Sequence, residues 1–167
     1  MKAAKELGYM PNAIAQSMKS QVTKTIGVLV GNIANPFFSE IIHSIEVKGA
    51  EAGYSVIIAN TGEDIDEEVK AIKTLYAKRI DGLIIATAQP NDMILDASKK
   101  RLYAGAVPVV YIDRELLNVN ELTIKADNFS GSYEATRYLI QKGHENIGLI
   151  ASIFTSTMYE RIGGYKK

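Results

Sequence analysis

Polar and aromatic side chains follow successive apolar segments of this 167-residue chain, and these are the residues whose chemistry could define a site. Carboxylates and amides beside aromatic rings suit a polyhydroxylated ligand, because its hydroxyls take hydrogen bonds while its C–H face stacks on a ring. Each residue also has a structural interpretation: Phe38 lies at core spacing in a helix, and Asp113 and Arg114 can form a surface ion pair. Their common position is what predicts a binding site. The set, in chain order, comprises Phe37, Phe38, Asn60, Thr61, Thr87, Asp113, Arg114, Asp127 and Asn128.

Signatures of nucleotide, hydrolase and thiol chemistry are missing from the sequence. There is no G-x-G-x-x-G after the first apolar segment, no G-x-x-x-x-G-K-[ST] and no G-x-S-x-G. The chain has no cysteine, which excludes disulfides, thiolate catalysis and Cys-based metal sites. His43 and His144 have no second ligand at metal spacing. We therefore expect no catalytic residue, no metal and no cofactor, and we expect that the protein is not an enzyme.

The stretch TIGVLVGNIANPFF, residues 25–38, must position the first of these side chains. An apolar run that ends at Gly31 and Asn32, followed by apolar residues at i, i+3, i+4 and i+7, predicts a doubly buried strand that leads into an amphipathic helix. Pro36 suits the first helical turn, and Asn35 suits the cap before it. In an open α/β fold, the loop after such a strand lies at the ligand-binding edge of the sheet.

The same alternation continues along the chain and predicts an α/β fold with a parallel, doubly wound sheet that helices cover on both faces. The segment 116–121 is too short for a crossover helix, so the fifth strand either turns back at the sheet edge or connects two lobes. The expected strands are 26–30, 55–59, 82–86, 107–112, 122–126 and 147–151, and the expected helices are 37–52, 67–79, 92–104 and 130–142.

The N-terminal segment has a different character from the rest of the chain. Residues 1–24 contain four lysines and one glutamate, a charge of +3, whereas the whole chain has a net charge of zero. Gly8 ends one short helical pattern, and a second short helix over 12–20 is too short to persist alone in water, so it must dock on a partner. A basic arm ahead of a mildly acidic body indicates a polyanion partner.

Composition limits the class of protein. With 47% hydrophobic residues, the chain can form a globular core, as about one domain or a large part of a two-lobed one. No apolar run approaches the roughly 20 residues of a membrane span, and the N-terminal sequence MKAAKELGY has no apolar signal-peptide core. We expect a cytoplasmic protein without membrane contact.

Several segments, taken in order, resemble the LacI/GalR family of bacterial transcription regulators. The match covers nearly the whole chain, and the series PNAIA-x-S, the IG strand, NPFF, D-G-L-I-I, D-R and G-H is highly specific. The resemblance implies a helix-turn-helix headpiece, a hinge helix and a two-lobed effector domain like a type I periplasmic sugar-binding protein. The matching segments are GYMPNAIAQSMKS, KTIGVLVGNIANPFFSEIIHSIE, EAGYSVIIANTGED, KRIDGLII, VPVVYIDRE, KADNFSGSYEATRYLIQKGHENIGLIAS and RIGGYKK.

The resemblance also implies how the chain is divided. Residues 1–23 correspond to the end of the headpiece and the hinge helix, 24–127 to the N-terminal lobe of the effector domain, and 128–167 to the start of the C-terminal lobe. We therefore interpret the chain as a fragment of a regulator. As it stands, we expect it to attract DNA with little sequence discrimination and to expose apolar surface over residues 128–167.

Individual roles follow from the resemblance as well. In this family the paired hinge helices enter the DNA minor groove, and an apolar side chain wedges between base steps. Met18 stands at that position, where leucine is usual. The neighbouring DNA-binding candidates are Asn12, Ala15, Ser17 and Lys19. The effector-binding candidates are Asn35, Phe37, Phe38, Asp113, Asp127 and Arg161.

The function implied is that of a homodimeric repressor of carbohydrate metabolism, whose binding to operator DNA is controlled by a sugar or sugar-phosphate effector. Helical segments 41–51 and 69–76 are the expected dimer contacts. A sugar-binding protein of a transport system is the alternative, and the lack of a signal peptide and the sequence PNAIAQSMKS argue against it. An enzyme such as a sugar-phosphate isomerase would need a nucleophile–base pair or a metal site, which the sequence does not supply.

Overall fold

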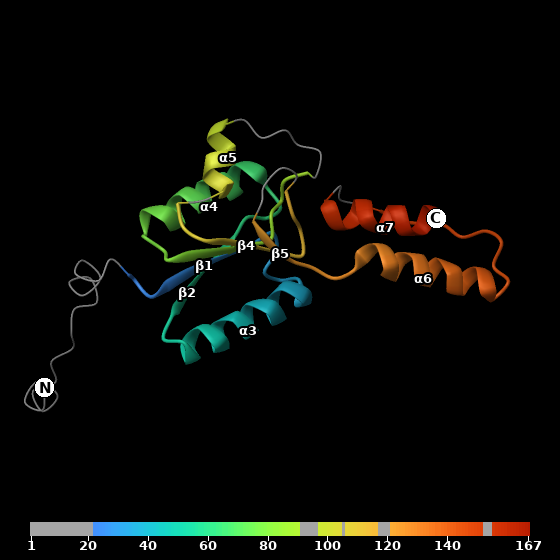
Figure 1. Cartoon of the computed structure of the whole chain (residues 1–167), viewed down its shortest axis with the longest axis horizontal. Helices are drawn as coiled ribbons and strands as arrows, with labels where there is room; N and C mark the ends of the chain where they lie inside the picture. Colours follow the sequence, from blue (N-terminus) through green and yellow to red (C-terminus); the bar gives the residue numbers. More distant parts are fainter. Residues whose placement is uncertain (1–21, 91–96, 105, 117–120, 152–154) are drawn as a thin grey trace, which may run out of the picture.

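A parallel five-stranded sheet with the order β2-β1-β3-β4-β5 forms the centre of the molecule. The computed structural model describes residues 22–90, 97–104, 106–116, 121–151 and 155–167. Helix α3 covers one face of the sheet, and α4 and α5 cover the other (Figure 1). The predicted doubly wound α/β fold is thus confirmed. The elements around the sheet are β1 (Thr25–Val30), α3 (Pro36–Glu51), β2 (Ser55–Asn60), α4 (Ile65–Ala77), β3 (Gly82–Ile85), α5 (Ala97–Ala104), β4 (Val109–Ile112) and β5 (Leu122–Ile124).

Capping residues determine where helices α3 and α4 begin. The side-chain oxygen of Asn35 accepts from the backbone N–H of Phe37 at 3.0 Å, and Pro36 takes the first helical position of α3. Asp64 accepts from the N–H groups of Asp66 and Glu67 at 2.8 and 2.9 Å at the start of α4. These carboxylate and amide oxygens satisfy donors that have no partner within the helix.

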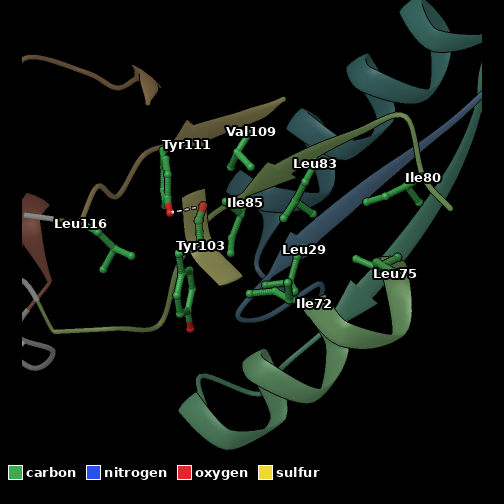
Figure 2. Packing of buried hydrophobic residues seen from close by; sticks show 10 residues of the cluster. All are labelled: Leu29, Ile72, Leu75, Ile80, Leu83, Ile85, Tyr103, Val109, Tyr111 and Leu116. Carbon is green, nitrogen blue, oxygen red and sulfur yellow. Dashed lines mark hydrogen bonds between the residues drawn. The ribbon is translucent and has the colours of Figure 1, made fainter. Parts of the chain in front are cut away.

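Alternate residues of β1, an inner strand of the sheet, pack into two separate cores. Leu29 packs with Ile72 and Leu75 of α4 on one face of the sheet, in a cluster that also contains Tyr103 of α5 (Figure 2). Val28 and its alternate neighbours on β1 point to the other face and pack against α3. Because successive strand side chains point to opposite faces, a strand covered on both sides must be apolar throughout.

The fifth strand lies at the sheet edge, but it does not turn back. It runs parallel to β4, with Val110 opposite Leu122 and Ile112 opposite Ile124. Leu122 and Ile124 remain 64% and 61% exposed. The turned-back arrangement is therefore wrong, and the strand instead leads towards the helix that follows it.

Two helices after the sheet pack side by side and extend away from it, as Figure 1 shows. They are α6 (Asn128–Gln141) and α7 (Ser156–Lys166). A Cβ on Gly164 would lie 2.8 Å from the backbone nitrogen of Tyr133, so glycine is needed for the close approach. A second contact between α6 and α7 is the hydrogen bond from the hydroxyl of Ser132 to the carbonyl of Arg161, at 2.7 Å.

The strand expected at 147–151 is absent. This segment has no strand structure, and Ile150 is 97% exposed. A strand is stable only when a neighbour takes its backbone hydrogen bonds, and none of the strands in the described residues pairs with it. Apolar spacing alone therefore predicted the wrong structure here.

Some predictions fall on parts that the structure does not describe. The hinge-helix segment 12–20, with Asn12, Ala15, Ser17, Met18 and Lys19, lies outside the described residues, as does the first part of the helix expected at 92–104. Within the described ranges, no helix is both long and apolar enough to cross a membrane.

We predict that Ile72→Ala lowers the free energy of unfolding by about 2–5 kcal/mol, because it removes a fully buried side chain and leaves a cavity. Urea denaturation measures this loss. Lys73→Ala, at the exposed next position of α4, is the matched control. Equal stability of the two variants would contradict the packing of α4 described above.

Candidate ligand-binding site

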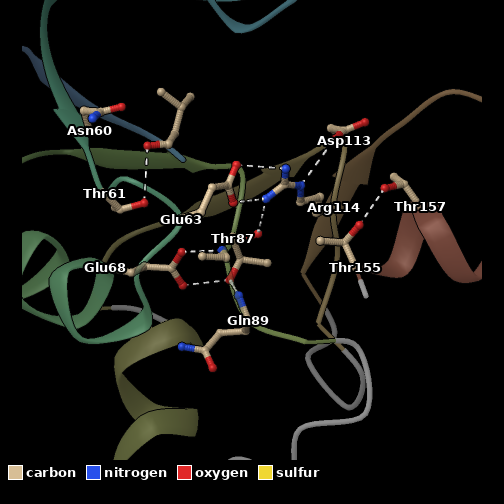
Figure 3. Close-up of polar contacts among 12 residues, drawn as sticks. Asn60, Thr61, Glu63, Glu68, Thr87, Gln89, Asp113, Arg114, Thr155 and Thr157 are labelled. Carbon is tan, nitrogen blue, oxygen red and sulfur yellow. Dashed lines mark hydrogen bonds and ion pairs between the residues drawn. The ribbon is translucent and has the colours of Figure 1, made fainter. Parts of the chain in front are cut away.

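Polar side chains from successive loops meet at the edge where the parallel strands end (Figure 3). Glu63 follows β2, Thr87 follows β3, and Asp113 and Arg114 follow β4. Parallel strands bring their carboxyl ends to the same edge of a sheet, which is where open α/β folds bind ligands.

The guanidinium of Arg114 is the centre of this cluster. Its Nη1 and Nη2 donate to the two carboxylate oxygens of Glu63 at 2.5 and 3.1 Å. Nη1 also donates to the carbonyl of Thr87 at 3.3 Å, and Nε lies 3.6 Å from Asp113 Oδ2. The ring of Phe38 lies beneath, 5.7 Å from the guanidinium carbon. A bidentate pair of this kind fixes the orientation of both side chains.

The backbone around the ion pair adopts an uncommon conformation. Gly62, Glu63 and Asp113 all have positive φ, at 64°, 63° and 61°. Such values cost a residue with a side chain some conformational energy, so the surrounding contacts must hold Glu63 and Asp113 in place. Gly31 makes room for the ion pair, because a Cβ at that position would overlap with the carboxylate of Glu63.

A buried carboxylate positions the loop after β3. Glu68 Oε1 accepts from the hydroxyls of Thr87 and Tyr103 at 2.7 and 2.6 Å, and Oε2 accepts from the N–H of Ala88 at 2.5 Å. Gln89 Nε2 donates to the hydroxyl of Tyr103 at 2.7 Å. Because the carbonyl of Thr87 also bonds to Arg114, the Glu68 cluster supports the Arg114 guanidinium indirectly.

Burial controls the ionisation of these groups. It raises the pKa of Glu68, against the lowering effect of its hydrogen bonds from Tyr103, Ala88 and Thr87. It also raises the pKa of Asp113, while Arg114 and Arg161 act against that rise. Both carboxyls therefore hold protons more readily than exposed ones do.

The start of α7 contacts the same edge of the sheet. Ser156 Oγ accepts from the N–H of Glu115, directly after Arg114, at 3.0 Å. Lys125 forms ion pairs with Glu115 and with Glu160 of α7 at 2.7 and 2.5 Å. These contacts place the first turn of α7 beside the end of β4. The hydroxyls of Thr155 and Thr157 lie 2.9 Å apart within that turn (Figure 3).

The structure gives the predicted effector residues different roles. Phe37 is 49% exposed, with its ring edge-on to Phe38 at 5.1 Å. Phe38 is buried in the core, with its ring 5.7 Å from the guanidinium carbon of Arg114, and its role in effector binding stays a prediction. Asn35 is exposed and caps α3, and Asp127 is exposed and caps α6 by accepting from the N–H of Ser130 at 2.9 Å.

Asp113 and Arg161 remain the charged candidates that could face a ligand. Asp113 lies beside Arg114, and Arg161 is close enough to influence its ionisation. Arg161 Nε donates to Asn128 Oδ1 at 2.9 Å, which ties α7 to the start of α6.

Sequence analysis left Glu63 and Glu68 out of the site and did not count Arg114 among the effector-binding candidates. Arg114 appeared only as a strand-end residue or surface ion-pair partner, yet it is buried and its main partner is Glu63. Glu68 had a usable signal: it precedes Ile72 and Leu75 at helical spacing, so a carboxylate stands on the apolar stripe of α4. No local sequence pattern predicts that Glu63 forms an ion pair with Arg114, which follows a different strand.

An apolar groove of about 660 Å³ runs along the α3 side of the sheet and reaches Asp113 at one end. Ile41 and Ile45 of α3 form one wall, and Ile84, Val110 and Ile124 of the sheet form the floor. Among the described residues, no group of three or more His, Asp or Glu side chains is placed to hold a metal ion.

Comparison with known proteins gives a consistent result. A family model described as periplasmic binding proteins and sugar binding domain of LacI family matches residues 23–167. The HTH-type transcriptional repressor PurR of Pasteurella multocida (strain Pm70) is 36% identical over 159 residues, which cover 94% of this chain and 46% of that protein. The chain spans about half the length of the curated relatives it matches.

Two solved structures share the fold. The Cra transcriptional dual regulator from Pseudomonas putida, in complex with fructose 1-phosphate, is 26% identical with a TM-score of 0.77, over 86% of this chain and 52% of that one. A periplasmic binding protein/LacI transcriptional regulator from Alkaliphilus metalliredigens QYMF, complexed with D-xylulofuranose, is 30% identical with a TM-score of 0.72, over 86% and 51%.

We predict a pH-dependent stability that Glu68 controls. Its raised pKa means that the folded chain keeps a proton that the unfolded chain loses near the ordinary value of 4.5. The unfolding free energy of the unmodified protein, minus that of Glu68→Gln, should therefore fall as the pH rises from 4.5 through the folded-state pKa of Glu68. Urea titrations over a pH series measure the difference. Glu67→Gln, at the exposed neighbouring position, is the control, and a difference for Glu68→Gln that is constant with pH would contradict the prediction.

Proposed function

The chain belongs to the family of periplasmic binding proteins and LacI-family sugar-binding domains, and from this membership we propose that it is part of a transcriptional repressor controlled by a small sugar-like effector. In this proposal residues 24–127 form the N-terminal lobe of the effector domain, and residues 128–167 begin the second lobe. Residues 1–23 connect the effector domain to the DNA-binding part. A repressor acts on operator DNA, so we place its action in the cytoplasm.

One observation carries the proposal: charged and polar groups from three loops and from α7 meet at the carboxyl edge of the sheet. Asp113 supplies acceptors for ligand hydroxyls, and Arg161 supplies donors. The exposed ring of Phe37 offers an apolar surface for the C–H face of a sugar. Two relatives of the same fold contain fructose 1-phosphate and D-xylulofuranose, which supports a sugar or sugar phosphate as the effector.

The relatives favour a regulator over a transport protein. The curated protein and the two structures compared above are all named as transcription regulators. A regulator also explains the basic segment at residues 1–24 better than a free sugar-binding protein does, because a basic arm attracts the phosphates of DNA.

We also propose that the repressor is a homodimer with α3 in its interface. Exposed Val47 and the groove-lining residues Ile41 and Ile45 give α3 apolar surface that a second subunit could cover. The segment 69–76 of α4 is a weaker candidate than expected, because its largest apolar side chains, Ile72 and Leu75, are buried in the core.

By crevice we mean the proposed binding site at the carboxyl edge of the sheet, which Asp113, Arg114 and Arg161 line. We predict that Asp113→Ala and Arg161→Ala each weaken effector binding by about tenfold to a hundredfold, because each removes a charged hydrogen-bonding partner from the crevice. Calorimetry of the full-length repressor with D-xylulose and fructose 1-phosphate measures the affinities. Lys78→Ala, on the exposed end of α4, is the control. Unchanged affinity in both crevice variants would overturn the assignment.

A second prediction concerns assembly of the full-length repressor. Val47→Glu should shift it from dimer towards monomer at micromolar concentration, because a charge would be desolvated in an apolar interface. Sedimentation velocity shows the shift. Lys73→Glu, an exposed position of α4, should leave the dimer intact. A monomer in the unmodified protein, or an undisturbed dimer in Val47→Glu, would count against α3 as the interface.

A further inference from the structure

The guanidinium of Arg114 is already neutralised within the chain. A guanidinium has five N–H donors. Those of Arg114 donate to both oxygens of Glu63 and to the carbonyl of Thr87, and its Nε forms an ion pair with Asp113 at 3.6 Å. The side chain of Arg114 is only 10% exposed, whereas that of Glu63 is 27% exposed. An anionic ligand would therefore meet the carboxylate of Glu63 before it met the cation.

Acidic groups outnumber basic ones at the ends of β2 and β4. Glu63 and Asp113 flank Arg114, and Arg161 is close enough to Asp113 to influence its ionisation. Glu115 and Glu160 share a single lysine, Lys125. A phosphate group would approach these carboxylates at short range, and like charges repel most strongly where water is partly excluded. Hydroxyl groups face no such repulsion, because carboxylate oxygens accept hydrogen bonds from them.

We propose that Glu63 is a specificity-determining residue that restricts the site to uncharged, hydroxyl-rich ligands. It does so by occupying the guanidinium to which a phosphate or carboxylate would bind in bidentate fashion. This inference rests on the proposed effector-binding function, and it selects a neutral sugar over a sugar phosphate.

Gly31 provides the space that the Glu63 carboxylate occupies beside Arg114. Gly31 lies at the end of β1, between the strands that carry Glu63 and Arg114, and a Cβ there would overlap with the Glu63 carboxylate. Gly31 has no positive φ, so alanine is compatible with its backbone. Gly31→Ala would therefore displace the carboxylate from Arg114 without changing the charge of the protein.

Inorganic phosphate is the probe that tests the proposal, because it needs no knowledge of the natural effector. Its affinity for the 167-residue chain can be measured by titration with ³¹P NMR line broadening. Glu63→Gln removes the blocking charge, and Gly31→Ala displaces it, so the second variant keeps the test open if the first does not fold. Glu67→Gln removes a carboxylate of the same type from an exposed site nearby and is the matched control.

We expect Glu63→Gln to bind phosphate about tenfold to a hundredfold more tightly than the unmodified chain, with a smaller gain in Gly31→Ala. The gain should vanish in the double variant Glu63→Gln/Arg114→Gln, and Glu67→Gln should match the unmodified chain. The proposal is overturned if the unmodified chain binds phosphate as tightly as Glu63→Gln, or if the gain survives without Arg114. Either result would leave the binding of neutral sugars through Asp113 and Arg161 untouched.

Discussion

The pairing of Arg114 with Glu63 is the interaction on which the carboxyl edge of the sheet depends. Glu63 follows β2 and Arg114 follows β4, so the pair passes over the ends of β1 and β3, which lie between them in the sheet. Gly31 at the end of β1 leaves the space that the carboxylate fills. Both groups are largely withdrawn from water, and the loss of one partner from such a pair leaves an uncompensated charge, which costs about 3–5 kcal/mol when the site is fully buried.

Both cores of the domain support this pair. Phe38 belongs to the cluster beneath α3 and lies under the guanidinium, while Glu68 belongs to α4 and holds Thr87, whose carbonyl accepts from Arg114. The helix on one face of the sheet therefore contacts this cation directly through Phe38, and the helix on the other face supports it indirectly through Glu68 and Thr87. Buried residues of the two cores thereby determine the positions of the polar groups in the crevice. The family membership of the chain supports the proposal that this crevice binds the effector.

Local patterns predicted much of the fold and less of the site. Apolar strands, the Asn35 and Asp64 caps and the parallel doubly wound sheet follow from spacing and propensity, which act over a few residues. The strand expected at 147–151 was wrong because a strand depends on a neighbour, which no local pattern reveals. The helical spacing of Phe38 indicated a core position, and its side chain is buried there. The partnership of Glu63 with Arg114 spans 51 residues of sequence, and only the folded sheet brings them together.

A double-mutant cycle tests the central claim most directly. The unfolding free energies of the unmodified chain, Glu63→Gln, Arg114→Met and the double variant give the coupling between the two side chains, free of their separate effects on packing. If the pair organises this edge of the sheet, the coupling should exceed about 1 kcal/mol, more than exposed ion pairs provide. Effects that add to within about 0.5 kcal/mol would show that the two groups act independently and would contradict the account.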